Sequence, residues 1–173
     1  FVVQVPFGQA NKDLSLSATV TEKRNSEPRT VSTLVPTVVN VKKDTSPPLV
    51  NIKAPKESGV EIQEHRSLPY HIEATDNVKV SSINVSLLAD KDQNGSFDDS
   101  DMVVNQLLLR PPYVGAIEVG NILEYVDTPS LTSLPLMFRV KAIDGVGNET
   151  IVERMIDLVK NPPPTVEVIS VID

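Results

Sequence analysis

Apolar and polar residues alternate along most of this chain with a period of two, which is the pattern of half-buried β-strands. Residues 66–75 are the clearest example, because Tyr70, Ile72 and Ala74 fall on one face of the predicted strand. The same alternation recurs in shorter stretches, at residues 14–18, 38–41, 49–52, 83–87, 102–109, 114–119, 138–142 and 151–159. The hydrophobic pattern therefore predicts an all-β protein.

Residue types that favour turns separate these stretches and argue against long helices. The chain contains 14 Pro, several of them adjacent, and an interior Pro costs a helix about 3 kcal/mol. Aromatic residues make up 4% of the sequence and Trp is absent, so Val, Ile and Leu must form the core. These aliphatic residues pack well on pleated surfaces. A chain of 173 residues suits one such domain or one and a half.

Charge and cysteine content narrow the functional classes. The formal net charge of −7 argues against a nucleic-acid partner, since phosphate binding needs a concentrated basic face. No stretch approaches the length of an apolar membrane span. The absence of Cys excludes disulfides and thiol catalysis but does not decide the compartment. No secretion-signal pattern opens the chain, and we interpret a sequence that starts at Phe1 as an excised or mature fragment.

An internal repeat organises the sequence. SPPLVNI at residues 46–52 matches PPPTVEVI at residues 162–169, which places equivalent prolines 116 residues apart. Further upstream, LSLSATVTEKRNSEP at 14–28 parallels LMFRVKAIDGVGNET at 136–150. The repeat predicts three parts: the last strands of one repeat at 1–45, one complete repeat at 46–161, and the first strand of a third repeat at 162–173.

Two stretches of the sequence resemble the immunoglobulin-like (Ig-like) repeats of large bacterial surface proteins and adhesins. ATDNVKVSSINV at residues 74–85 has their A-x-D-N-x-x-V pattern, and FRVKAIDGVGNET at 138–150 has their A-x-D-x-x-G-N pattern. The resemblance is looser over residues 1–45, where Glu22 to Asn25 replaces the expected turn. It implies tandem antiparallel two-sheet sandwiches of about seven strands each, without the disulfide and buried Trp of antibody domains.

Residues 90–101, which we call the acidic loop, read DKDQNGSFDDSD and have the spacing of an oxygen-rich cation loop. Calcium takes 6–8 oxygen ligands at about 2.3–2.6 Å, and a loop of this spacing wraps such oxygens around one point. Lys91 is the loop's one basic residue, and Gly95 permits a sharp reversal of the backbone. We predict a structural Ca²⁺ held by these ligands: Asp90, Asp92, Asn94, the backbone carbonyl of Ser96, Asp98 (directly or through water) and Asp101.

The alternative interpretation of the acidic loop is a solvated turn that holds no ion. An EF-hand has Glu at the twelfth loop position, where this chain has the shorter Asp101. In that respect the loop is more similar to the calcium loops of dockerins and thrombospondin type-3 repeats. No flanking helices are predicted, which argues against a calcium sensor. Phe97, at the eighth position, is expected to anchor the loop on the core.

Other candidate residues fit structural roles better than chemical ones. His65 and His71 are the two imidazoles of the chain, and no nucleophile-elbow pattern accompanies them. Asp76 and Asp144 follow predicted strands, where capping of a turn is a better interpretation than ion binding. We therefore predict that the chain is not an enzyme.

These features favour a non-catalytic structural or adhesive module of an extracellular repeat protein, at a bacterial cell surface or secreted. The expected partners are neighbouring Ig-like repeats of the same or another chain, together with a surface protein or glycan. One alternative is a filament subunit that assembles by strand complementation, with residues 165–171 as the donor strand. A second is a carbohydrate-binding accessory module of a secreted enzyme, which would need exposed aromatic platforms.

Overall fold

The computed structural model describes residues 12–22, 29–32 and 37–164, and the chain divides into two compact units, Phe1–Thr45 and Ser46–Asp173. Within its described residues the larger unit has eight strands: β5 (Leu49–Ala54), β6 (Val60–Gln63), β7 (Ser67–Thr75), β8 (Val80–Ala89), β9 (Met102–Leu108), β10 (Tyr113–Glu118), β11 (Ser133–Asp144) and β12 (Glu149–Val159).

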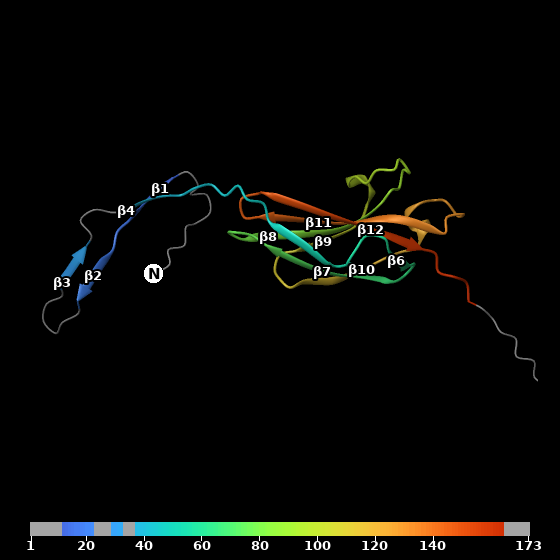
Figure 1. Ribbon diagram of the computed structural model, residues 1–173, viewed down its shortest axis with the longest axis horizontal. Coiled ribbons are helices and arrows are strands. Elements are labelled where there is room, and N and C mark those ends of the chain that lie inside the picture. The colour runs from blue at the N-terminus through green and yellow to red at the C-terminus, as the bar shows by residue number, and fades with distance from the viewer. Residues whose placement is uncertain (1–11, 23–28, 33–36, 165–173) are drawn as a thin grey trace, which may run out of the picture. The chain divides into compact units, whose positions relative to one another are not determined.

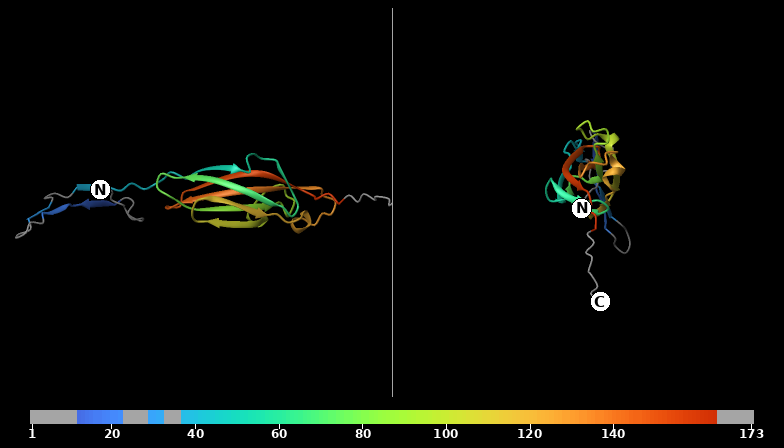
Figure 2. Two further views of the ribbon diagram at one scale, coloured as in Figure 1. Left: turned by 90° about the horizontal axis from the view of Figure 1, so that it is seen from below. Right: turned by 90° about the vertical axis from the view of Figure 1, so that its right-hand side faces the viewer.

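The strands of the larger unit form two sheets, which Figure 1 and Figure 2 show as two layers. One sheet has the strand order β10-β7-β5, and the other has the order β6-β12-β11-β8-β9. Neighbouring strands are antiparallel except β6 and β12, which run parallel. This arrangement is an Ig-like β-sandwich, which confirms the predicted fold class.

Side chains from both sheets form one core, and the alternation in the sequence accounts for which residues enter it. Alternate residues of β7 and β11 are buried in the core, while their neighbours are more exposed. β8 alternates in the same way only in its first half, because its last five residues are all buried. Burial of each large aliphatic side chain contributes about 1.5–3 kcal/mol. The core includes Ile83, Val85, Leu87, Phe138, Val140, Ile156 and Leu158 from one sheet and Ile52, Leu68, Tyr70, Ile72 and Ile117 from the other.

A polar contact joins the two sheets beside the core at Tyr70. The Tyr70 hydroxyl donates to Gln106 Oε1 of β9 at 2.8 Å, and Gln106 Nε2 donates to the Ala116 carbonyl of β10 at 3.3 Å. Gly115 is paired with Tyr70 in the sheet, and a Cβ at Gly115 would lie 2.5 Å from the Tyr70 hydroxyl oxygen. The missing side chain of Gly115 therefore makes room for the ring of Tyr70.

The larger unit differs from the sequence prediction in two places. Its described residues form eight strands, where about seven were expected, because the short segment β6 pairs with β12. The connection between β10 and β11 contains a short helix, α1 (Ile122–Tyr125), where no helix was predicted. Glu64 holds this connection, since its Oε1 accepts from the Ile122 amide at 2.9 Å and its Oε2 accepts from the Asn161 amide at 3.1 Å.

The smaller unit contains two pairs of short antiparallel strands in its described residues. β1 (Asp13–Leu16) pairs with β4 (Thr37–Asn40), and β2 (Thr19–Glu22) pairs with β3 (Arg29–Ser32). Most of the described side chains in this unit are exposed, including Val20 and Val31. None of the helices described in either unit has the length and apolar character needed to cross a membrane.

Candidate calcium-binding loop

The acidic loop connects β8 to β9 and ends in a 3-10 turn, η1 (Asp99–Asp101). Two residues at the loop's reversal, Gln93 and Gly95, have positive φ angles of 54° and 81°. Glycine adopts this left-handed conformation without steric cost, which explains the glycine at the sixth loop position. The backbone thus makes the reversal that the sequence predicted.

Three of the predicted ligands converge in the structure. One carboxylate oxygen from each of Asp90, Asp92 and Asp101 lies within 4.8 Å of the other two. Asp101 is buried, although the loop around it is largely exposed. The arrangement brings the first, third and last positions of the loop to one point, which is the geometry that a multi-oxygen cation site requires.

Backbone amides of the loop hold these carboxylates in place. Asp101 closes the loop, because its Oδ1 accepts from the Lys91 amide at 3.0 Å and its Oδ2 accepts from the Asp98 amide at 3.0 Å. Asp90 accepts from the Asn94 amide at 3.0 Å and from the Gly95 amide at 2.8 Å. A carboxylate oxygen has more than one lone pair, so these bonds orient the acids and leave acceptor capacity for an ion.

Asn94 and Asp98, two of the other predicted ligands, have different surroundings. Asn94 lies beside the cluster, since its Nδ2 donates to Asp92 Oδ2 at 2.7 Å and its Oδ1 accepts from the Ser96 amide at 2.7 Å. Asp98 is outside the group of three converging carboxylates, and its Oδ1 accepts from the amide and hydroxyl of Ser100 at 2.7 and 2.6 Å. The hydroxyl and amide of Ser100 lower the pKa of Asp98 below its usual value.

Arg139 of β11 attaches the second half of the acidic loop to the five-stranded sheet. Its Nη2 donates to the Phe97 carbonyl at 3.0 Å, and its Nη1 lies 3.5 Å from Asp99 Oδ1. The Nε of the same guanidinium donates to Glu153 Oε1 of β12 at 2.7 Å. Sequence reasoning missed this residue, because no local pattern marks a contact between positions 42 residues apart.

Lys91 makes a second attachment inside the loop. Its ammonium donates to the carbonyls of Ser100 and Met102 at 3.1 and 2.9 Å. The loop's one basic side chain is therefore directed to backbone carbonyls at the end of the loop. Its ammonium group has no described contact with the Asp90, Asp92 and Asp101 carboxylates.

The expectation that Phe97 anchors the loop on the core is wrong. Phe97 is half-buried and lies outside the core cluster, and its carbonyl rather than its ring makes the described contact with the sheet. Leu88 is a further buried residue of the five-stranded sheet. It sits between the inward residues Leu87 and Ala89, pairs with Met137 of β11, is fully buried, and does not belong to the core cluster.

Asp76 and Asp144 cap turns, as the sequence predicted. Asp76 Oδ1 accepts from the Val78 and Lys79 amides at 2.9 and 2.8 Å. Asp144 is buried, and its Oδ1 accepts from three successive amides, those of residues 146–148, at 2.7–2.8 Å. The two turns lie side by side, since a carboxylate oxygen of Asp76 and one of Asp144 are within 4.8 Å of each other.

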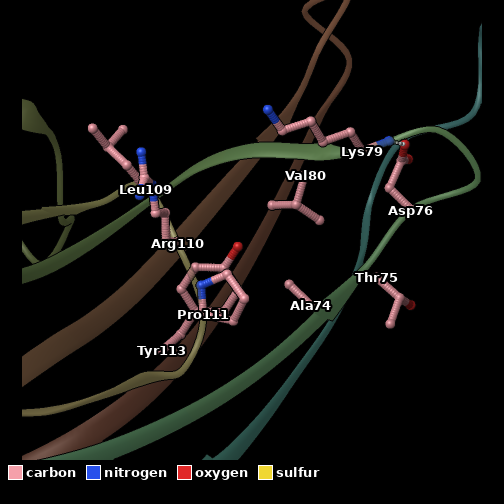
Figure 3. Close-up of a pocket in the computed structure, with 9 residues that line it drawn as sticks. All are labelled: Ala74, Thr75, Asp76, Lys79, Val80, Leu109, Arg110, Pro111 and Tyr113. Carbon is pink, nitrogen blue, oxygen red and sulfur yellow. Dashed lines mark hydrogen bonds between the residues drawn. The ribbon is translucent and has the colours of Figure 1, made fainter. Parts of the chain in front are cut away.

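A pocket of ≈ 510 Å³ opens between the end of β7, the start of β8 and the turn after β9 (Figure 3). Lys79 and Arg110 bring two cationic side chains to it, and Ala74, Val80 and Pro111 bring apolar surface. Tyr113 is the aromatic residue among those that line the pocket, and it is 6% exposed. The pocket therefore offers no open aromatic face to a ligand.

Of the comparisons with known proteins, the one with solved structures found similar chains. No protein-family model matches the sequence, and no curated protein matches it. The fibronectin(III)-like modules of Clostridium thermocellum CbhA are similar at 18% identity and a TM-score of 0.48, over 88% of this chain and 65% of that chain. Murine CRIg is similar at 11% identity and a TM-score of 0.38, over 68% of this chain and 100% of that one. The Ig-like fold is established by the sheet order and register described above.

Proposed function

We propose that this chain is a non-catalytic structural module of an extracellular repeat protein, stiffened by one Ca²⁺ in the acidic loop. The observation that carries this proposal is the convergence of Asp90, Asp92 and Asp101 within 4.8 Å. Calcium prefers carboxylate, carbonyl and water oxygens. The carbonyl of Ser96 and the amide oxygen of Asn94 are the further ligands that the loop would supply.

A solvated turn without an ion explains this convergence less well. A pair of like charges about 4 Å apart costs on the order of 1–4 kcal/mol between a water-like and a protein-like dielectric. The amides of Lys91, Asn94 and Gly95 hold the acids together against this repulsion. A divalent cation between the carboxylates would turn the repulsion into attraction.

The ion would stabilise the acidic loop, which is the long connection between β8 and β9. Extracellular calcium modules bind with a Kd of about 10⁻⁴–10⁻³ M. At a free calcium concentration about tenfold above Kd, the ion would stabilise the folded state by about 1.4 kcal/mol. That contribution is small beside the core, so the proposed role is local stiffening rather than folding.

Titration calorimetry on chelator-treated protein tests the calcium site. Asp92 is exposed, and Asp92→Asn removes one ligand charge without a change of shape. Asp127→Asn is the matched control, because Asp127 is also exposed and lies outside the loop. We expect the first variant to raise the calcium Kd at least about tenfold and the second to leave it unchanged. Absence of binding heat in the unaltered chain, or equal effects of the two variants, would contradict the proposal.

Residues 1–45 are proposed to be the last strands of a preceding repeat. The β2–β3 pair supports this, because it falls where the repeat aligns the end of β11 with the start of β12. An isolated two-stranded hairpin is marginally stable in water, and Val20 and Val31 are exposed on this one. A preceding sheet of the same repeat would cover them. The proposed setting is a bacterial cell surface or a secreted fibre.

Two other functions stay as alternatives. In a strand-complementation filament the donor would be residues 165–171, which lie outside the described residues. A carbohydrate-binding module needs aromatic platforms, and the aromatic side chains within the described residues are buried or half-buried. That observation favours the structural module over the carbohydrate-binding module.

A further inference from the structure

The pocket between the end of β7, the start of β8 and the turn after β9 holds two cationic side chains that have no acidic partner. Among the described residues, neither the Lys79 ammonium nor the Arg110 guanidinium makes an ion pair or a hydrogen bond. In contrast, Lys53, Arg139 and Lys141 each pair with a carboxylate on a neighbouring strand. Both unpaired cations line one cavity of ≈ 510 Å³, which is a volume typical of ligand sites.

Asp76 is the acidic residue among those that line the pocket, and its carboxylate is engaged by the backbone. Its Oδ1 accepts from the Val78 and Lys79 amides, and its Oδ2 is buried. In Figure 3 the Lys79 side chain extends toward the side where Arg110 lies and away from the Asp76 carboxylate. Two cations and one carboxylate give the lining one net positive charge, which complements a single carboxylate better than a doubly charged phosphate.

Apolar surface adjoins the two cations. Ala74, Val80 and Pro111 line the pocket, and Leu109, which also lines it, is 62% exposed. A ligand that matches both features carries a carboxylate with aliphatic groups beside it. A sugar acid matches less well, because sugars stack on open aromatic faces and Tyr113, the aromatic residue of the lining, is 6% exposed. An Asp or Glu side chain between aliphatic residues of a polypeptide has the required chemistry.

We propose that this pocket is a docking site for an acidic peptide segment of a partner protein. One Asp or Glu carboxylate of the partner binds Lys79 and Arg110, and the aliphatic residues beside it cover Val80 and Leu109. Arg110 supplies a planar fork that can donate two parallel hydrogen bonds to the carboxylate, and Lys79 supplies a compact positive charge. The pocket shares no residue with the acidic loop, so peptide binding does not require the calcium ion.

Nuclear magnetic resonance titration of the whole chain with short peptides tests this proposal. The probe is acetyl-Leu-Glu-Val-amide, and the control peptide is acetyl-Leu-Gln-Val-amide, which has the same shape without the charge. We expect the acidic probe to shift the amide resonances of residues 74–80 and 109–113, and the neutral peptide to bind at least about tenfold more weakly. The absence of shifts at about 10 mM acidic probe, or equal binding of the two peptides, would overturn the proposal.

Matched charge variants then locate the contact. Arg110 is exposed, so Arg110→Gln should fold normally, and we expect it to raise the Kd of the acidic probe at least about tenfold. Arg66→Gln is the control, because Arg66 is also exposed and precedes β7 at the end away from the pocket. An equal effect of the two variants would mean nonspecific attraction by charge and would overturn the proposal. So would tighter binding of a galacturonate trisaccharide or of inorganic phosphate than of the acidic peptide.

Discussion

The Nη2 atom of Arg139 lies 3.0 Å from the carbonyl oxygen of Phe97, and this bond fastens the acidic loop to the five-stranded sheet. The same guanidinium reaches Glu153 on β12 at 2.7 Å. One side chain on the central strand β11 therefore links the loop to a neighbouring strand. The second half of the loop is therefore held by contacts with the sheet.

Loss of this guanidinium should loosen the loop. Arg139→Met keeps much of the side-chain stem but removes the bonds to Phe97 and Glu153, and we expect it to destabilise the protein by about 1–3 kcal/mol. Lys141→Met is the matched control, because Lys141 lies on the same strand and pairs with Glu149 at 2.8 Å in a more exposed setting. Its expected cost is about 0–1 kcal/mol. Urea denaturation measures both.

Hydrogen exchange separates a local effect of Arg139 from a general loss of stability. In Arg139→Met the amides of residues 97–101 should exchange faster, while those of β7, which is in the other sheet, should change only as much as global stability does. Uniform acceleration across both sheets would show that Arg139 does not act as a fastening for the loop.

Gly115 is expected to tolerate no side chain. In Gly115→Ala the new Cβ would lie 2.5 Å from the Tyr70 hydroxyl oxygen and 2.7 Å from its Cζ. The ring must shift within a packed core, and overpacking of this kind costs about 1–3 kcal/mol. Thermal unfolding followed by circular dichroism measures the loss. A variant as stable as the original chain would show that Tyr70 has free space beside β10.

Removal of the Tyr70 hydroxyl should have a smaller effect. Tyr70→Phe leaves Gln106 without the donor that now lies 2.8 Å away, and one neutral hydrogen bond contributes about 0.5–1.5 kcal/mol. Gln106 would keep its bond to the Ala116 carbonyl. A double-mutant cycle with Gln106→Leu isolates the pairwise energy, and a coupling near zero would mean that this bond does not stabilise the contact between the sheets.

The lowered pKa of Asp144 predicts how the stability of the protein depends on pH. Burial by itself would raise the pKa of Asp144, but bonds from the amides of Val146, Asn148 and Gly147 and from the Asn148 side chain hold the pKa below its usual value. The Asp144 carboxylate therefore binds a proton less readily in the folded state than in the unfolded state. The resulting stability is complete above the unfolded pKa of about 3.9 and is lost as pH falls through the folded pKa.

Asp144→Asn tests this dependence. At pH 7 the variant should lose about 1–3 kcal/mol, because it weakens charge-assisted hydrogen bonds in a buried turn. The difference from the original chain should narrow as pH is lowered below about 4. Asp127→Asn, an exposed isosteric change, serves as the control. Parallel stability curves for the Asp144 variant and the original chain from pH 7 to pH 3 would contradict the assignment.

Calcium removal should change stability modestly and locally. Chelation in a solution where calcium stood about tenfold above Kd should lower the free energy of unfolding by about 1.4 kcal/mol. The same treatment should lower the free energy of unfolding of Asp92→Asn by at most about 0.4 kcal/mol, because its Kd is expected to be at least about tenfold higher. A loss of several kcal/mol would mean that the ion supports the whole sandwich rather than the loop.

Local sequence patterns predicted most of the strands and the positions of the converging acids. Alternation worked for β7 and β11 because one face of each strand is buried and the other is not. The spacing of acidic residues in the loop identified Asp90, Asp92 and Asp101, because these residues are close in sequence. β6 was missed because four residues are too few for their alternation to stand out and because its partner β12 lies far along the chain. The contact between Arg139 and Phe97 was missed for the same reason of distance.

Anomalous diffraction from a crystal grown in about 10 mM calcium, well above the expected Kd, tests the central claim most directly. We predict one strong anomalous peak from a calcium ion that lies about 2.3–2.6 Å from oxygens of Asp90, Asp92 and Asp101. A well-ordered acidic loop with no such peak would contradict the claim.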